Sequence, residues 1–524
     1  MKAKYLAACM VLSIFMVSGL GGCQSAGGAA AAESSNQAAE NSGAENESQE
    51  NESEKNVSAD ITYDSEDQDD TWSEDTSTLV TCSGSSVSIK GTGASESGGS
   101  VTITEAGTYV ISGTLSDRKI VIDAGSEDLV RLVLNEISVT SSDGAAIYGK
   151  QSGKLVIILA EGTENTVMDG SVYSELDEKS EPDAAVFSKD DITINGTGSL
   201  SISGNYKNGI HSKDGLKIIG GTLSINAVNH DVSGKDYVAV GGGVLQLSSA
   251  EDAIHSAADV WITGGDITID AGDDGIHGDG TVTIDGGTIQ IKNSTEGIEG
   301  TVITINGGEI SLNASDDGIN GSDGSSDESA GTAMNGGMGG MDEAQENVLV
   351  EITGGILYVN AEGDGIDSNG SLSITGGEIM VDGPSRGGNG ILDYNGTAEI
   401  TGGTLVAAGT SDMAQTFSSD SGQCSLLYVY NTAQGEGTEL TLKVSSGSVA
   451  ASSTPSKTYG AVIISSPQMK EGETYTLYSG STKVADIALD SLHTTAGAYS
   501  GQGGMNGEMG KRGMPDGGLG PVMP

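Results

Sequence analysis

An acidic residue recurs before a Gly-Ile or Ala-Ile pair at intervals of about 22 positions, and a second polar residue follows it three positions later. Carboxylate and amide oxygens are the ligands that calcium prefers, and calcium accepts six to eight of them in a flexible geometry. A series of such residues could therefore hold calcium if the fold brings its members into register. The first series is Asp252, Asp274, Glu296, Asp317 and Asp364, and the second is His255, His277, Glu299, Asn320 and Asp367.

Two other interpretations of these series stay open. Asp-Gly is an ordinary turn pair, because the Asp side chain accepts hydrogen bonds from nearby backbone N–H groups. His255 and His277 could indicate zinc, although the oxygen ligands around them favour a solvated corner.

Charge repulsion favours the calcium interpretation. Unit charges stacked about 4.8 Å apart repel by about 0.9 kcal/mol in water and by about 3.5 kcal/mol at an effective dielectric of 20. A column of several carboxylates therefore needs counter-ions. We predict calcium as the cofactor, with these ligands: Asp252, Asp274, Glu296, Glu299, Asp317, Asp364 and Asp367.

The residues between these positions predict the element that must hold them. In residues 260–300 the pair Gly264-Gly265 is followed 22 positions later by Gly286-Gly287, and Val, Ile and Thr alternate with polar residues around each pair. Alternation of period two marks β-strands, and a repeat of this length with several strands marks a solenoid whose coils bury their apolar faces by stacking. The sequence therefore predicts an all-β parallel β-helix with about 22 residues per coil.

Each Gly pair has a predicted role at a bend between strands. The number of positions from Ile262 to Ile267 is odd, so the inward-facing parity must change across Gly264-Gly265, and glycine supplies the unusual φ that this requires. The apolar residues two positions before the turn glycines should then form one internal ladder: Ile194, Ile218, Val240, Ile262, Ile284, Ile305, Ile352, Ile374 and Ile400.

The N-terminal residues have the layout of a bacterial lipoprotein signal. An apolar run follows Lys2 and Lys4 and ends in Leu20-Gly21-Gly22-Cys23, and it is shorter than a membrane-spanning helix. We expect residues 1–23 to be the signal and Cys23 to carry the lipid. This lipid anchor would place the protein at the extracellular side of the cell membrane. Residues 24–78 are rich in Ser, Asn and Glu and should form a disordered acidic linker between the anchor and the folded part.

The remaining boundaries follow from changes in the repeat. We expect the β-helix at residues 79–424 with an insertion at 321–347, a cap of antiparallel strands at 425–490, and a disordered Gly/Met tail at 491–524. Cys82 and Cys424 lie near opposite ends of the solenoid, so a disulfide between them is not expected. The net charge of −51 argues against nucleic acid or an anionic lipid surface as a partner and for cations.

Several sequence blocks resemble a known family. They are A-G-T-Y-V-I-S-G-T-L, A-E-G-T-E-N-T, the long block from D-A-A-V-F-S-K to H-S-K-D, and the units with a Gly pair followed by D-G-I. Together they resemble the clostridial-type carbohydrate-binding β-helix lipoproteins. The resemblance implies a fold like that of polysaccharide lyases and binding of calcium, cellulose and pectic polysaccharides. His230-Asp231-Val232 departs from the D-G-I pattern, and the insertion interrupts the repeat.

Binding of a polysaccharide by stacking needs aromatic side chains that point outward. The alternation places Trp261 and Tyr358 outward on two different strands, and three more tyrosines are candidates. The full set of candidate ligand-binding residues is Trp261, Tyr358, Tyr237, Tyr206 and Tyr394.

Catalysis is less favoured than binding. A polysaccharide lyase needs a base such as Lys or Arg beside a cation, and basic residues are few in the repeats. No catalytic residue is therefore assigned. We predict a surface-anchored protein that binds a plant-type or acidic polysaccharide with calcium; the alternatives are a lyase acting on uronate polymers and a non-catalytic structural or adhesive rod. The sequence indicates neither the sugar nor the oligomeric state.

Overall fold

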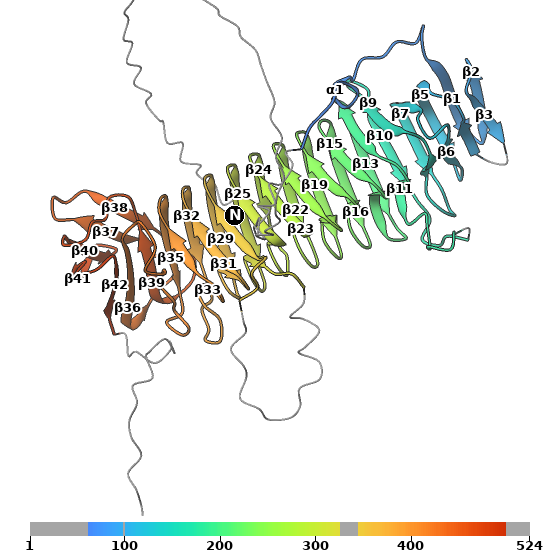
Figure 1. Ribbon diagram of the computed structural model, residues 1–524. Helices are drawn as coiled ribbons and strands as arrows, with labels where there is room; N and C mark the ends of the chain where they lie inside the picture. Colours follow the sequence, from blue (N-terminus) through green and yellow to red (C-terminus); the bar gives the residue numbers. More distant parts are fainter. Residues whose placement is uncertain (1–60, 98–99, 175, 325–343, 499–524) are drawn as a thin grey trace, which may run out of the picture. The chain divides into compact units, whose positions relative to one another are not determined.

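The computed structural model describes residues 61–97, 100–174, 176–324 and 344–498. It is 55 % strand and 1 % helix, and its strands form a parallel β-solenoid of about 13 turns with roughly 23 residues per turn (Figure 1). The predicted parallel β-helix is therefore confirmed. Three parallel ladders of strands form the three faces of this solenoid.

The first face carries the predicted internal ladder. Its strands pair in parallel register from one coil to the next. They are β1 (Thr78–Gly84), β5 (Gly107–Ser116), β7 (Leu129–Thr140), β9 (Lys154–Leu159), β12 (Ile192–Gly196), β15 (Gly215–Ile218), β18 (Tyr237–Val240), β21 (Asp259–Ile262), β23 (Ile276–Ile284), β25 (Ile298–Ile305), β28 (Leu349–Ile352), β31 (Ser371–Ile374) and β34 (Ala398–Ile400).

The second face follows each Gly pair and leads to the turn that holds the acidic residues. Its strands are β10 (Glu164–Met168), β13 (Ser199–Gly204), β16 (Thr222–Ala227), β19 (Val244–Ser249), β22 (Asp266–Asp270), β24 (Thr288–Ile291), β26 (Glu309–Ala314), β29 (Ile356–Ala361), β32 (Glu378–Asp382) and β35 (Thr404–Gly409).

The third face begins after that turn. It contains the N-terminal parts of β23 and β25 together with shorter strands. These are β4 (Ser100–Ile103), β6 (Lys119–Asp123), β8 (Ile147–Gln151), β11 (Ala184–Ser188), β14 (Asn208–Ser212), β17 (Val232–Gly234), β20 (Ile254–Ser256), β27 (Ile319–Gly321), β30 (Ile366–Ser368) and β33 (Leu392–Tyr394).

The interior of the solenoid contains the predicted aliphatic ladder. Each of its nine residues pairs in register with the next, from Ile194 with Ile218 through to Ile374 with Ile400, and each is completely buried. A β-branched side chain fits this position because its few rotamers pack directly on the identical side chain of the next coil. The ladder prediction is therefore confirmed.

The two glycines of each pair have different roles. The second adopts positive φ in each coil, as Gly265 (+102°) and Gly287 (+95°) do, a backbone conformation that side chains disfavour. A Cβ on the first would meet a backbone carbonyl of the preceding coil, at 2.7 Å for Gly264 and 2.4 Å for Gly307. The pair therefore bends the chain and lets neighbouring coils approach closely.

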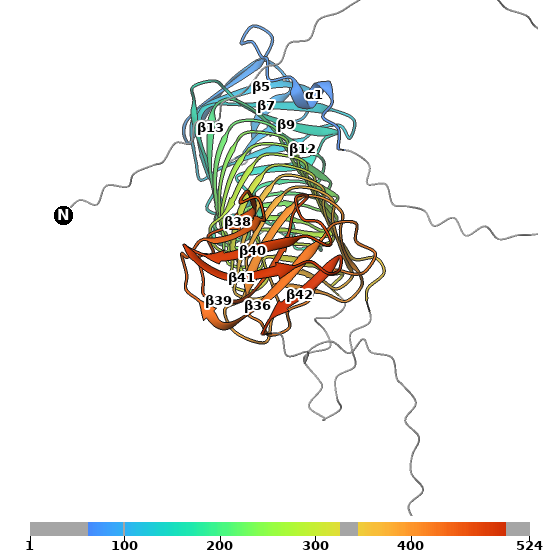
Figure 2. The same cartoon turned by 90° about the vertical axis from the view of Figure 1, so that its left-hand side faces the viewer.

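Further strands close both ends of the stack, and all but one of the pairs that they form are antiparallel. At the N-terminal end β2 (Ser86–Lys90) pairs with β1, and β3 (Ala94–Ser97) pairs with β4. At the C-terminal end β36 (Ser425–Gln434), β39 (Tyr459–Ser465) and β42 (His493–Gly497) lie across the last coil (Figure 2). A second sheet packs beside them and contains β37 (Leu440–Val444), β38 (Val449–Ser453), β40 (Thr474–Ser479) and β41 (Thr482–Ala488).

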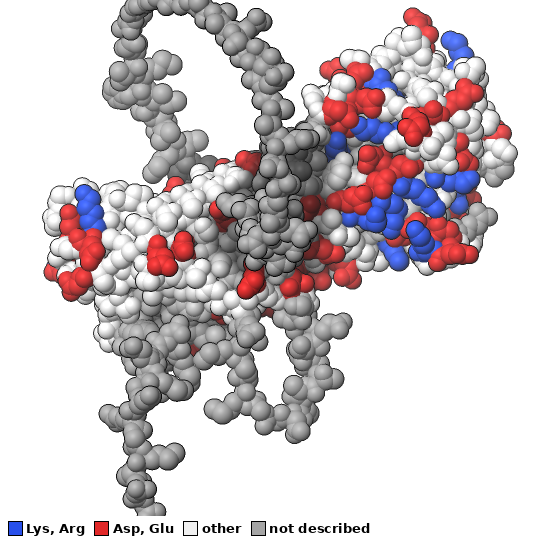
Figure 3. All heavy atoms as spheres, in the orientation of Figure 1, with Lys and Arg blue, Asp and Glu red and all other residues white. Residues whose placement is uncertain are grey.

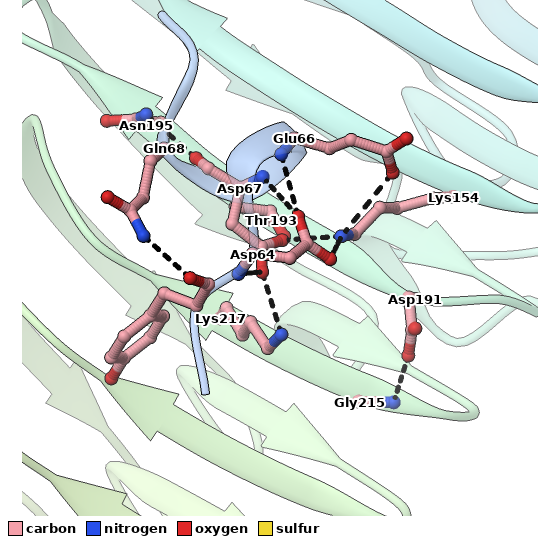
Figure 4. A network of polar contacts seen from close by, with 11 residues as sticks. Asp64, Glu66, Asp67, Gln68, Lys154, Asp191, Thr193, Asn195, Gly215 and Lys217 are labelled. Atoms are coloured by element: carbon pink, nitrogen blue, oxygen red, sulfur yellow. Dashed lines mark hydrogen bonds and ion pairs between the residues drawn. The ribbon is translucent and has the colours of Figure 1, made fainter. Parts of the chain in front are cut away.

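The segment before β1 packs on the outside of the first face. It contains the short helix α1 (Ser65–Gln68), and the Asp67 side chain is fully buried. Asp67 accepts bonds from Lys154 (2.7 Å), Lys217 (2.8 Å) and Thr193 (2.6 Å), as Figure 4 shows. Burial would raise the pKa of Asp67, but these partners hold it at about 2. Residues 61–77 therefore differ from the predicted linker, because a charged network fixes them to the solenoid.

The remaining predictions from the sequence fall partly within and partly outside the described residues. The strands of residues 425–490 are antiparallel as expected, and β42 extends the cap to residue 497. Cys82 and Cys424 are both free and buried. Cys23, the signal, the linker up to residue 60, most of the insertion and most of the tail lie outside the described residues. Within the described part of the chain, no helix is long and apolar enough to cross a membrane.

Removing one residue of the internal ladder should weaken the stack. We expect Ile305→Ala to destabilise the protein by about 2–5 kcal/mol, because it leaves a cavity between two coils. Thr304→Ala, which changes the outward-facing neighbour on β25, should cost no more than about 0.5 kcal/mol. Urea denaturation followed by circular dichroism measures both; equal midpoints for the two variants would contradict the ladder as the source of stability.

Removing the buried carboxylate should release the N-terminal segment. Asp67→Ala leaves Lys154 and Lys217 without their carboxylate partner, a loss of about 3–5 kcal/mol for a buried pair. We expect faster proteolytic cleavage within residues 61–77, measured by mass spectrometry of timed digests. The Asp70→Ala variant, which changes an exposed residue, should be cleaved like the unmodified protein. Equal cleavage rates for Asp67→Ala and Asp70→Ala would exclude Asp67 as the residue that holds this segment on the solenoid.

Candidate metal centre

The two predicted polar series form two adjacent columns along one corner of the solenoid. The first column lies in the turn from the second to the third face, and the second column lies on the outward side of the third face. Strand pairing places His255 beside His277, His277 beside Glu299, and Asn320 beside Asp367. We call these the turn column and the face column.

Members of the turn column also tie neighbouring coils together. The backbone N–H of Asp274 donates to Asp252 Oδ1 (3.1 Å), and that of Glu296 donates to Asp274 Oδ1 (3.3 Å). The Asp364 N–H donates in the same way to Asp317. One carboxylate oxygen thus has the structural role expected of a turn, and the second oxygen stays available for a cation or a side chain.

Two groups of carboxylates could each hold a cation. One ligand atom from each of Asp274, Glu296 and Glu299 lies within 4.8 Å of the others, and the same holds for Asp364, Asp367 and Asp393. Between the two groups, Asn320 Nδ2 donates to Glu296 (2.7 Å), while the buried Asn320 Oδ1 has no hydrogen-bond partner. This donor set consists of hard oxygens, including one orphaned amide oxygen, and it fits calcium.

The pKa values of several carboxyls in the two columns are raised. Burial and the charges of Asp274 and Asp317 raise the pKa of Glu296 to about 8. Burial and the neighbouring carboxylates likewise raise the pKa of Asp317 to about 7 and that of Asp367 to about 8. The folded protein therefore binds protons at these positions near neutral pH unless a cation replaces them.

The N-terminal part of the two columns is built from histidines. His230 and His255 stack with ring centroids 4.3 Å apart, and His277 meets His255 edge-on at 5.2 Å. Burial and the neighbouring His255 lower the pKa of His230 to about 4. Burial would also lower the pKa of His277, but Asp274, Glu299 and Asp252 raise it. Burial alone would raise the pKa of Asp252, and the hydrogen bond with His255 keeps it below its ordinary value.

His230 and Asp393 were not among the predicted site residues. His230 occupies the turn column where the repeat has an acid, so its departure from the D-G-I pattern was the available signal. Asp393 pairs with Asp367 across a coil that is longer than the regular repeat, and the longer spacing hid it.

Two of the five predicted aromatic residues are neighbours. Tyr237 and Trp261 meet edge-on with ring centroids 6.0 Å apart. Trp261 points away from the interior as predicted, yet only 9 % of it is exposed. The N-terminal segment covers this part of the face, since Tyr63 Oη bonds with Thr263 (3.2 Å) and Lys217 lies within 6.0 Å of both the Tyr63 and Tyr237 rings. Trp261 thus offers little surface to a sugar in this arrangement.

The other three aromatic residues lie apart from this pair and from one another. Tyr206 stacks on the buried Tyr173 at 4.2 Å. Tyr358 donates through its hydroxyl to Asp382 (2.7 Å), and Tyr394 donates to the backbone carbonyl of Thr416. All three are partly exposed. Because these three residues lie apart from the Tyr237–Trp261 pair and from one another, the five residues do not form one stacking platform.

Lysines gather beside the histidines. On the face drawn in Figure 3, basic and acidic side chains cluster over the N-terminal coils, and fewer charges lie towards the cap. Lys207, Lys213 and Lys235 line a hollow of 210 Å³ together with His211, His230 and His255. Lys213 is paired with Glu181 (3.0 Å), and Lys235 is paired with Asp236 (2.9 Å). Asp183 also lines this hollow and pairs with His211 (2.6 Å), so basic and acidic groups meet there.

Comparison with known proteins relates the chain to carbohydrate-binding proteins. A protein of Acetivibrio thermocellus described as a carbohydrate-binding domain-containing protein is 40 % identical over 128 residues, which are 24 % of this chain and 45 % of that protein. The chain therefore spans less than half of that relative's length.

A solved structure is also similar. The polysaccharide lyase-like protein from C. thermocellum, determined as a gadolinium derivative, is 30 % identical with a TM-score of 0.40, over 46 % of this chain and 96 % of that one. The family model of carbohydrate-binding domain-containing proteins matches residues 97–347, which include both columns as far as Asn320. Residues 97–347 of this chain are therefore similar to carbohydrate-binding domain-containing proteins.

Proposed function

We propose that this protein binds an acidic polysaccharide at the corner columns, with calcium held by the carboxylates and shared with the sugar. The observation that carries the proposal is the run of buried and partly buried carboxyls that begins at Asp274 and ends at Asp393. Within this run, burial and neighbouring carboxylates raise the pKa values of Glu296, Asp317 and Asp367. The family match supports a carbohydrate ligand.

Calcium resolves the conflict between an acidic protein and an acidic ligand. The chain carries a net charge of −51, so it repels a uronate polymer in the absence of a cation. A calcium ion held by Glu296, Glu299 and Asp274 would leave coordination positions for water or for a sugar carboxylate, because calcium takes more ligands than this group supplies. Asp364, Asp367 and Asp393 would hold a second ion in the same way.

The columns also suit a polymer rather than a single sugar. The turn column and the face column repeat once per coil, so equivalent groups recur about every 4.8 Å along the corner. An extended polysaccharide lying along this corner would meet the two proposed calcium ions in succession. Binding through several weak contacts on one chain raises the total affinity without any one strong site.

The proposed location is the outer face of the cell membrane. A lipid on Cys23 would anchor the chain, because several acyl chains on one cysteine bury many methylenes at about 0.8 kcal/mol each. The acidic residues up to position 60 would then separate the β-helix from the membrane.

Calcium should stabilise the folded protein, and more so as the pH rises. Carboxyls with raised pKa values bind protons more tightly when folded, so in EGTA the stability should fall as the pH rises from about 5 to about 8. Calcium binds the ionised form and should restore about 2.7 kcal/mol at a hundredfold excess over its Kd. Thermal unfolding with calcium and with EGTA, at both pH values, measures this.

A matched pair of double variants controls for charge. Asp274→Asn with Asp317→Asn removes two charges from the columns, and Asp266→Asn with Glu309→Gln removes two exposed charges from the second face of the same coils. The first variant should lose the calcium effect and the second should keep it. Identical melting temperatures with calcium and with EGTA in the unmodified protein would mean that the columns serve only as turns.

Binding of polysaccharide should depend on calcium. We expect polygalacturonate to retard the protein in affinity electrophoresis with calcium, and EGTA or the Asp274→Asn, Asp317→Asn variant to abolish the retardation. The variant with Asp266→Asn and Glu309→Gln should bind like the unmodified protein. Ultraviolet absorbance of the same mixtures reports the unsaturated product of elimination; sustained product formation would establish a lyase, and retention of no acidic or insoluble polysaccharide would favour a structural rod.

A further inference from the structure

Three histidine nitrogens surround one buried carboxylate oxygen in the N-terminal part of the columns. Asp252 Oδ2 lies 3.0 Å from His255 Nδ1, 3.4 Å from His230 Nδ1 and 3.7 Å from His277 Nδ1. The other oxygen of Asp252 accepts the Asp274 N–H, so the turn already fixes the orientation of this carboxylate. The side chain of Asp252 is only 7 % exposed.

His277 belongs to a neighbouring set of acids. Its Nδ1 lies closer to Asp274 Oδ2 (3.1 Å) than to Asp252 Oδ2, and Glu299 lies 3.5 Å from the same nitrogen. His230 and His255 have Asp252 as their nearest carboxylate. One ligand atom from each of His230, Asp252 and His255 lies within 4.8 Å of the others.

His230 Nδ1 provides a second, independent observation. This atom is inaccessible to solvent and has no hydrogen-bond partner, although it points to within 3.4 Å of a carboxylate oxygen. A buried polar atom without a partner is costly, and a bound cation would satisfy its lone pair.

We infer that His230, Asp252 and His255 form a transition-metal site of the zinc type, separate from the oxygen-only sites of the acidic columns. Two imidazole nitrogens and one carboxylate oxygen are a ligand set that zinc accepts, with bonds of about 2.0–2.2 Å. Bonds of that length in a tetrahedron place ligand atoms about 3.4 Å apart. The nitrogen-to-oxygen distances of 3.0 and 3.4 Å are therefore close to what the metal needs.

Ligand chemistry separates this site from the calcium sites. Imidazole selects zinc and related divalent metals, whereas calcium takes oxygen ligands almost exclusively. The carboxylate groups formed by Asp274, Glu296 and Glu299 and by Asp364, Asp367 and Asp393 contain no imidazole. The metal preference therefore changes along the columns. In the turn column His230 stands where later coils have an acid, and in the face column acid or Asn replaces histidine after His277.

The site can be reached by a metal ion from solvent. His230 and His255 are also part of the lining of the 210 Å³ hollow, together with Lys207 and Lys235. Three protein ligands leave one tetrahedral position for water or another ligand, the arrangement of open zinc sites.

The test is zinc binding by isothermal titration calorimetry on chelator-treated protein in excess calcium, which fills the oxygen sites. We expect one zinc ion per chain in the unmodified protein. His230→Ala and His255→Ala should each weaken zinc binding by at least about 10- to 100-fold, the loss that even an outer partner of a metal ligand produces. His493→Ala, which changes a histidine of the cap, should bind zinc normally.

His230→Asp is the most informative variant because it gives this coil the acid that four of the following coils carry at the same position. It should lose zinc binding while its melting temperature without metal shows that it is folded. Cobalt titration provides a second readout, since cobalt gives intense visible bands in a tetrahedral site, and the inferred site needs both histidine ligands to form one. Absence of zinc binding by the unmodified protein in calcium, or equal binding by the unmodified protein, His230→Asp and His255→Ala, would overturn the inference.

Discussion

The stacking of coils in register, through parallel backbone hydrogen bonds, is the constraint on which the rest of this structure depends. Each coil places its residues directly over those of its neighbour, so any residue type that recurs once per coil becomes a continuous column. The Gly pairs make this stacking possible because the first glycine of each pair lies against a backbone carbonyl of the coil before. Apolar residues then form an internal ladder, and polar residues at the corner form columns.

The same constraint creates an electrostatic problem at the corner. Carboxylates that recur once per coil cannot avoid one another, and burial at the turn removes the water that would screen them. Protonation of the carboxyls, calcium binding and pairing with histidine would each reduce this repulsion. In the C-terminal part of the columns the carboxyls hold protons more tightly than usual, and in the N-terminal part histidines surround Asp252. On these proposals, the composition of each part of the columns decides which cation that part would favour.

The N-terminal segment covers the part of the first face where a sugar could otherwise stack on Tyr237 and Trp261. The buried charge of Asp67 holds α1 against Lys154 and Lys217. Tyr63 then bonds with Thr263, and Lys217 Nζ lies within 6.0 Å of both the Tyr63 and Tyr237 rings. The aromatic pair is thus covered by the protein's own chain, whereas the corner columns lie on another part of each coil. This separation favours the corner over the aromatic pair as the ligand-binding surface.

The sequence by itself determined the fold class, the internal ladder and those members of the polar columns that recur at the regular spacing, because parallel stacking preserves the period of the repeat. Ile262 and Ile284 are 22 positions apart in the sequence and are neighbours in the ladder for that reason. Only the tertiary structure decided what breaks the period. It placed His230 beside Asp252 and His255, paired Asp393 with Asp367 across a longer coil, and laid Tyr63 against strands near residue 263. The contact of Tyr63 joins segments with no repeating relation, so no pattern along the chain predicts it. His230 keeps the spacing of the turn column and Asp393 follows a longer coil, so their partners depend on side-chain packing as well as on the repeat.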